Sequence, residues 1–130
     1  DWMEEMFHIQ SLTVEAVRKE GVCVLNADDA YIVPLMDRAR GRIILYGIKG
    51  NTPVMKKHIA RGGEVLFAEK GSAFYVKDRY KQRLARLEDI VIQDSFSGAG
   101  IYVALAAAAV CSALRIYPDA KAITFSKSWV

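Results

Sequence analysis

Residues 21–47 read GVCVLNADDAYIVPLMDRARGRIILYG, and two short apolar runs begin in this stretch. The runs at 22–26 and 42–48 are continuous rather than alternating, as in strands that are buried on both faces of a sheet. Between them, apolar residues recur with helical spacing over about 30–39. A strand, a helix and a second strand in this order predict a parallel β-sheet with helices packed on it.

The flanking segments continue this alternation. Apolar residues recur with helical spacing over 3–19, which predicts a helix before the first strand. Asn51 or Thr52 can cap a further helix over 53–61, because the proline that follows suits a first helical turn. Residues 1–63 are therefore expected to alternate between helix and strand.

The pattern changes at residue 64. Residues 64–78 read EVLFAEKGSAFYVKD, which predicts two strands joined by a tight turn at EKGS. One or two more strands follow in 81–92, so 64–94 is predicted to be antiparallel β-structure.

The last segment, 95–130, contains an Ala-rich helix at about 100–115 and a tail that ends in extended structure. We therefore predict one α/β domain over 1–130. It combines a partial Rossmann-like parallel sheet, flanking helices and a small antiparallel β extension.

Composition excludes several classes of protein. The chain is 52% hydrophobic and 25% charged, which is typical of a folded globular unit. Its net charge of +3 comes with no dense basic run, so nucleic-acid binding is not expected. The longest apolar run, at 101–114, is shorter than the ~20 residues that span a bilayer, so no membrane association is expected. Cys23 and Cys111 form no CxxC pair, and a reducing, cytoplasmic location fits them best.

Four stretches carry a resemblance to a known family: GVCVLNADD at 21–29, DRARGRIILYG at 37–47, NTPVMKKHIARGGEVLFAEKGSAFYVKD at 51–78 and ALAAAAVCSAL at 104–114. Together they resemble the C-terminal portion of the central domain of the Mur ligase superfamily. More narrowly, they are similar to the cyanophycin synthetase family, and the third stretch is the most specific to it. The resemblance covers nearly the whole chain.

This resemblance implies that the parent protein is an ATP-dependent ligase that forms amide bonds, with ATP and magnesium as cofactors. It implies a peptide substrate of the aspartate and arginine type, and the remainder of the ligase domain as a partner. The phosphate-gripping sequence GxxGKT or GxxGKS does not occur in these 130 residues. We therefore expect no catalytic residue in this chain and no ligase activity from the chain alone.

Two positions depart from the family's pattern. Gln10 stands where the resemblance leads us to expect Lys, and Ala104 stands where it leads us to expect an Asn that contacts adenine. These departures favour an alternative function. The chain would then be a non-catalytic, degenerate ligase-like module for interaction or oligomerisation, with another copy of itself as a partner.

Polar residues at the end of the first strand are the first candidate site. In open parallel sheets, ligands bind beyond the carboxyl ends of the strands, so Asn26, Asp28 and Asp29 are candidates for a nucleotide cleft. The alternative, which we favour, is that Asn26 bonds loop backbone and that Asp28 or Asp29 caps the next helix. Ser97 and Gly98 precede the Ala-rich helix, where free amides could bind an anion or simply shape the loop.

Basic residues on the helix at 53–61 form the second candidate site. Lys56, Lys57 and Arg61 could contact an anionic substrate, although an ordinary solvated helix face is the interpretation that we favour. His58 lies near the end of the same helix, where a positive charge would stabilise the helix dipole. With two histidines in the chain and no cysteine near them, no metal site is expected.

Overall fold

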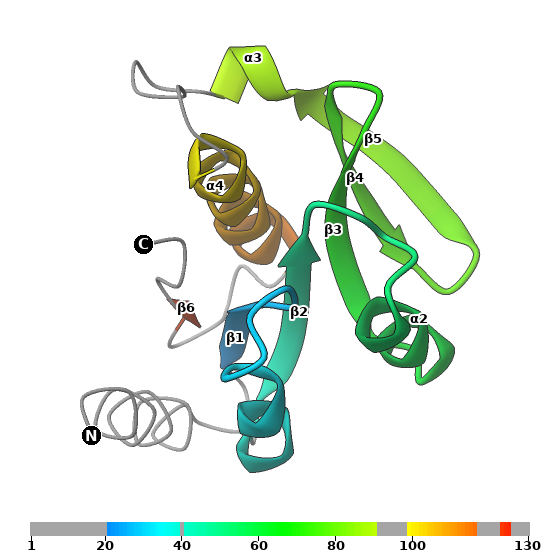
Figure 1. Cartoon of the computed structure of the whole chain (residues 1–130), viewed down its shortest axis with the longest axis vertical. Coiled ribbons are helices and arrows are strands. Elements are labelled where there is room, and N and C mark those ends of the chain that lie inside the picture. The colour runs from blue at the N-terminus through cyan, green and yellow to red at the C-terminus, as the bar shows by residue number, and fades with distance from the viewer. Residues whose placement is uncertain (1–20, 40, 91–98, 117–122, 126–130) are drawn as a thin grey trace.

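The computed structural model describes residues 21–39, 41–90, 99–116 and 123–125 (Figure 1). The helix predicted over 3–19 lies outside this part. The elements in chain order are β1 (Val22–Asn26), the 3₁₀ helix η1 (Val33–Arg38), β2 (Arg42–Gly47), α2 (Pro53–Ala60), β3 (Glu64–Glu69), β4 (Ser72–Lys77), β5 (Tyr80–Arg86), α3 (Leu87–Ile90), α4 (Ala99–Ile116) and β6 (Ile123–Phe125).

The strands form one mixed sheet in the order β5-β4-β3-β2-β1-β6. β1 pairs in parallel with β2 and β6, and β2 pairs in parallel with β3. β4 then runs antiparallel to both β3 and β5. The predicted fold class, a parallel sheet with flanking helices and a small antiparallel extension, is confirmed. Two predictions within 64–94 are corrected: β3 pairs in parallel with β2 as well as antiparallel with β4, and residues 87–90 are helical rather than extended.

Helices cover both faces of the sheet, which explains why the strand sequences are continuously apolar. On one face, Val24, Ile44 and Leu66 pack against Leu105 and other residues of α4. On the opposite face, alternate strand residues pack against η1 and α2. This second cluster contains Cys23, Leu25, Ala27, Ile32, Leu35, Leu45, Met55 and Val65. Figure 1 shows α4 on one side of the sheet and α2 on the other.

Helix α2 begins and ends with recognisable caps. The Thr52 hydroxyl accepts a hydrogen bond from the Met55 N–H at 3.4 Å, so Thr52 rather than Asn51 is the N-cap. At the other end, the N–H of Gly62 bonds the carbonyl of Ile59, and the N–H of Gly63 bonds the carbonyl of His58. This is a Schellman motif, and it needs the left-handed backbone that Gly62 adopts at φ 81°.

The turn predicted between β3 and β4 is confirmed. Lys70 and Gly71 connect the strands, and both have positive φ, 48° and 76°. Two central residues with positive φ are the signature of the type I′ turn that suits the twist of a hairpin.

The helix predicted over 30–39 differs in the structure in its type and in its N-cap residue. The structure has a 3₁₀ helix over Val33–Arg38, whose N-cap is Ile32 with no side-chain hydrogen bond. Neither Asp28 nor Asp29 caps it, because both carboxylates bond backbone N–H groups elsewhere. The helix predicted over 100–115 is confirmed as α4, and none of the described helices is long and apolar enough to cross a membrane.

The two cysteines are free and lie in different settings. Cys23 is fully buried in β1, while Cys111 is exposed on α4. Burial raises the pKa of the Cys23 thiol to about 11, so this thiol stays protonated and behaves as a small apolar core residue.

Candidate functional site

The sheet order places the end of β1 where ligands bind in open α/β sheets. The chain proceeds from β1 to β2 on one side, while β6 lies on the other side of β1. Such a reversal of strand order creates a crevice beyond the carboxyl ends of the strands. Asn26 is the last residue of β1, and Gly47 is the last residue of β2. We call Asn26, Asp28, Asp29 and the groups that they contact the carboxyl-edge cluster.

Asn26 organises the loop that follows β1. Its side chain is buried, with 2% exposure, and its Oδ1 accepts a hydrogen bond from the Asp28 N–H at 2.9 Å. Its backbone carbonyl accepts a bond from the Asp29 N–H at 3.3 Å. The prediction that Asn26 bonds loop backbone is therefore confirmed.

Asp28 joins three elements that are far apart in the sequence. Its Oδ2 accepts a hydrogen bond from the Ile48 N–H at 2.9 Å and another from the Tyr102 hydroxyl at 3.0 Å. Its carboxylate also lies against Gly47, where an added Cβ would meet Oδ1 at 3.0 Å. One exposed carboxylate thus links the ends of β1 and β2 to the first turns of α4.

Tyr102 is held in its donor form by this arrangement. Burial raises the pKa of Tyr102, and the negative charge of Asp28 and the hydrogen bond to it raise that pKa further. The hydroxyl therefore keeps its proton and donates a hydrogen bond to the carboxylate throughout the neutral range.

The other predicted nucleotide-cleft residues divide into two groups. Asp29 forms a local turn, because its Oδ1 accepts a hydrogen bond from the Tyr31 N–H at 2.8 Å. Ser97 and Gly98 lie outside the described residues, so their predicted role stays a prediction. Ala104, at the position where the family pattern has Asn, is buried on α4 with 1% exposure.

The side chains of the carboxyl-edge cluster supply mainly hydrogen-bond acceptors. Two carboxylates and one amide suit hydroxyl groups or metal-bound waters better than phosphates, which carry the same charge sign as the carboxylates. Among the described residues, no three His, Cys, Asp or Glu side chains come together as a metal site. The cluster can therefore form one wall of a site but does not build a phosphate cradle.

A double-mutant cycle tests the link between Asp28 and Tyr102. We expect Tyr102→Phe to lower the free energy of unfolding by about 1 kcal/mol, because the hydrogen bond is lost while the ring remains. In the Asp28→Ala background the same change should cost almost nothing. Urea denaturation of the four proteins measures the coupling. Equal costs in both backgrounds would contradict the link.

The basic candidates on α2 do not all share one surface. Lys57 and Arg61 line a cleft of about 440 Å³ between α2 and η1, together with Asp37, whereas Lys56 is not among its lining residues. All three basic side chains are exposed. The structure thus brings two of the three predicted residues together and adds a carboxylate beside them.

His58 differs from its predicted role. Its Nε2 donates a hydrogen bond to the Ile43 carbonyl at 3.0 Å, which ties α2 to β2. Burial lowers the pKa of His58, and this effect outweighs the Ile43 hydrogen bond and the charge of Glu64, which act in the opposite direction. The imidazole is therefore uncharged at neutral pH, and the idea of a cation at the end of the helix is wrong.

Sequence reasoning missed Tyr102 and Gly47 as parts of the carboxyl-edge cluster. Tyr102 lies 74 residues from Asp28. A tyrosine in an apolar helix gives no signal of its own, so this contact is visible only in the tertiary structure. Gly47 could have been noticed as a glycine at a strand end, where close approach of another group is a common reason for glycine.

Comparisons with known proteins agree with the resemblance seen in the sequence. No family model matches the chain. Among curated proteins, cyanophycin synthetase from a Nostoc species is 28% identical over 90 residues, which are 69% of this chain. The Synechocystis enzyme is 26% identical over 87% of the chain, and the Crocosphaera subtropica enzyme is 24% identical over 85%.

The match covers most of this chain but only a small part of each relative. The match takes in 10% of the Nostoc protein and 13% of the Synechocystis protein, so the chain spans about a tenth of the length of its relatives. The expected resemblance is confirmed at this level: the chain is similar, over most of its length, to a segment of cyanophycin synthetase.

Proposed function

We propose that this chain, as a relative of a segment of cyanophycin synthetase, is part of an ATP-dependent ligase that forms amide bonds. The observation that carries the proposal is the shared sequence over 69–87% of the chain with proteins that all bear this name. We further propose that the chain contributes one wall of the nucleotide cleft. The position of the carboxyl-edge cluster at the ends of β1 and β2 supports this.

Within that wall, Asn26, Asp28 and Asp29 have different tasks. Asn26 and Asp28 fix the loop and the first turns of α4, since their oxygens already accept hydrogen bonds from the protein. The remaining acceptor capacity of Asp28 and Asp29 suits the ribose hydroxyls or the waters around magnesium. When bound, ATP supplies the phosphoryl group that activates a carboxylate in such ligases. The missing GxxGKT or GxxGKS motif leads us to propose that this chain alone is inactive.

Thermal unfolding with magnesium and ATP tests the nucleotide wall. A ligand at ~100 times its dissociation constant adds ~2.7 kcal/mol to stability, so millimolar ATP should raise the melting temperature in a saturable way. Asp29→Asn should reduce this shift, because it removes a carboxylate and keeps the acceptor of the local turn. Glu88→Gln removes an exposed carboxylate from α3, outside the carboxyl-edge cluster, and should leave the shift unchanged. The absence of any shift at millimolar ATP would contradict the proposal.

For the substrate, we propose an anionic peptide of the aspartate and arginine type. The cleft between α2 and η1 supports this, because Lys57 and Arg61 both line it. A poly-aspartate peptide in the same melting experiment, at low and high salt, tests the idea, since surface charge contacts weaken as salt rises. We also propose a cytoplasmic location, supported by the two free cysteines.

A second candidate function is a non-catalytic interaction module. The observation that favours it is Ala104, which is buried and offers no amide at the position where the family pattern has Asn. Its partner would be another copy of the chain or the remainder of the ligase. A dimer in light scattering, together with no ATP-dependent melting shift, would favour this module over the nucleotide wall.

A further inference from the structure

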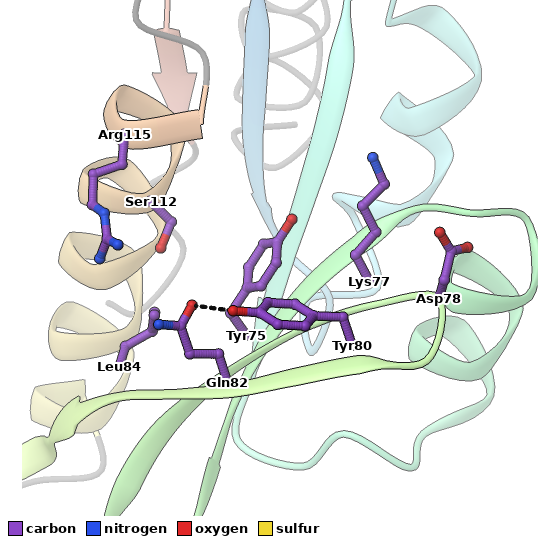
Figure 2. Close-up of a pocket in the computed structure, with 8 residues that line it drawn as sticks. All are labelled: Tyr75, Lys77, Asp78, Tyr80, Gln82, Leu84, Ser112 and Arg115. Carbon is purple, nitrogen blue, oxygen red and sulfur yellow. Dashed lines mark hydrogen bonds between the residues drawn. The ribbon is translucent and has the colours of Figure 1, made fainter.

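We propose that a cleft between the β4–β5 hairpin and the C-terminal half of α4 binds a small organic anion. We call it the hairpin cleft, and its volume is about 450 Å³. Its lining residues, drawn in Figure 2, are Tyr75, Lys77, Asp78, Tyr80, Gln82, Leu84, Ser112 and Arg115. Pockets that hold small molecules have volumes of this order.

The cleft exists because α4 is placed over one part of the sheet and the hairpin extends past it. α4 packs in one cluster with residues of β1, β2 and β3 and with Ala73 and Tyr75 of β4, while β4 and β5 form the outer edge of the sheet. In Figure 1 the hairpin projects away from α4. The two walls are therefore separate elements: six of the lining residues come from the hairpin, and Ser112 and Arg115 come from the helix (Figure 2).

The hairpin cleft lies at the opposite end of the sheet from Asp28. Lys77 pairs with Glu64, the first residue of β3, so this end of the hairpin is at the amino ends of the parallel strands. Arg115 is in the last turn of α4, whereas Tyr102, which bonds Asp28, is in its first turns. A ligand here thus goes beyond the proposed nucleotide wall.

The aromatic wall of the hairpin cleft is held in place before any ligand arrives. The Tyr75 hydroxyl donates a hydrogen bond to the buried Glu64 carboxylate at 2.6 Å. The Tyr80 hydroxyl donates to Gln82 Oε1 at 3.0 Å, and the two tyrosine rings meet edge to face, with centroids 6.5 Å apart. Tyr80 nevertheless stays 57% exposed. A fixed, exposed ring offers a flat apolar surface at low entropic cost.

The polar groups of the hairpin cleft are mostly donors. Arg115 and Lys77 carry positive charges, and neither forms an ion pair in the part of the chain that the structure describes. The Gln82 amide keeps its NH₂ donors, because its oxygen is taken by Tyr80. Asp78, at the tip of the β4–β5 turn, is the one carboxylate among the described lining residues.

These groups define the class of ligand. The donors and the two cations are complementary to a ligand with negatively charged acceptor oxygens. The tyrosine wall is complementary to a flat or apolar ligand body. A carboxylate or a phosphate attached to such a body meets both needs. A neutral molecule of the same shape would leave the two cations without a partner.

Nuclear magnetic resonance titration of the whole 130-residue chain tests this proposal, with benzoate, phenyl phosphate and neutral benzamide as probes. We expect one or both anions to shift the backbone amide signals of Tyr80, Gln82 and Ser112, and benzamide to bind more weakly. Tighter binding of benzoate identifies a carboxylate ligand, and tighter binding of phenyl phosphate identifies a phosphate.

Two variants locate the anion. Arg115→Gln should weaken binding about tenfold, as expected for the loss of one charge-assisted hydrogen bond. Arg79→Gln removes the same charge from the exposed β4–β5 turn without touching the lining, so its binding should match that of the original chain. The proposal is overturned if neither anion shifts these signals at millimolar concentration. It is also overturned if benzamide binds equally well, or if both variants lose affinity equally.

Discussion

Replacing Leu105 with alanine is expected to lower the free energy of unfolding by about 3 kcal/mol. Leu105 is fully buried on α4 and packs with Val24, Ile44 and Leu66 of the sheet. Removing its side chain loses the transfer free energy of three carbons and leaves a cavity that rigid strands cannot fill. Denaturation by urea, followed by circular dichroism, measures the change.

The control for this prediction lies two residues further along the helix. Ala107 is exposed, so Ala107→Ser changes the same helix without touching the core, and a loss of less than about 0.5 kcal/mol is expected. If Leu105→Ala costs no more than this control, α4 does not pack on the sheet as described. The hairpin cleft, which has α4 as one of its walls, would then not form as described.

Replacing Gly63 with alanine is expected to cost about 2 kcal/mol, although this change adds only one methyl group. A Cβ at Gly63 would overlap the ring of His58, closer than Cβ atoms approach other heavy atoms in proteins. The ring cannot move aside freely, because its Nε2 bonds the Ile43 carbonyl and the ring is half-buried. Either the added methyl group strains the surrounding packing, which costs roughly 1–3 kcal/mol, or the ring moves away and its hydrogen bond to Ile43 breaks.

A second substitution separates this clash from other effects of Gly63→Ala. In the background of His58→Ala the ring is absent, so the added methyl group should cost less than about 0.5 kcal/mol. The difference between the two backgrounds measures the contact directly. A cost that stays at about 2 kcal/mol without the ring would mean that backbone strain, rather than His58, makes Gly63 necessary.

Several local features followed directly from the residues. The continuous runs VCVLN and RIILYG predicted strands buried on both faces, and both strands form there. Asn51 or Thr52 before a proline predicted the start of α2, and EKGS predicted the turn between β3 and β4. These signals are local because capping and turn formation depend on neighbouring residues and on their own backbone angles.

Other features could not be predicted in this way. The segment after NADD was expected to be a helix capped by Asp28 or Asp29, yet it is a 3₁₀ helix without a side-chain cap. Asp28 instead bonds Ile48 and Tyr102, which are 20 and 74 residues away. A carboxylate has several possible donors, and which of them it meets depends on how the strands and α4 are packed.

The sequence by itself determined the α/β class, the strands at 22–26 and 42–47, the start of α2 and the resemblance to cyanophycin synthetase. Each of these depends on the period of apolar residues or on motifs within a few positions. Only the tertiary structure decided that Asp28 joins β1, β2 and α4, that His58 is an uncharged donor, and that the hairpin and α4 enclose a donor-rich cleft. These features depend on distances and burial between distant segments, which the packing of the chain alone sets.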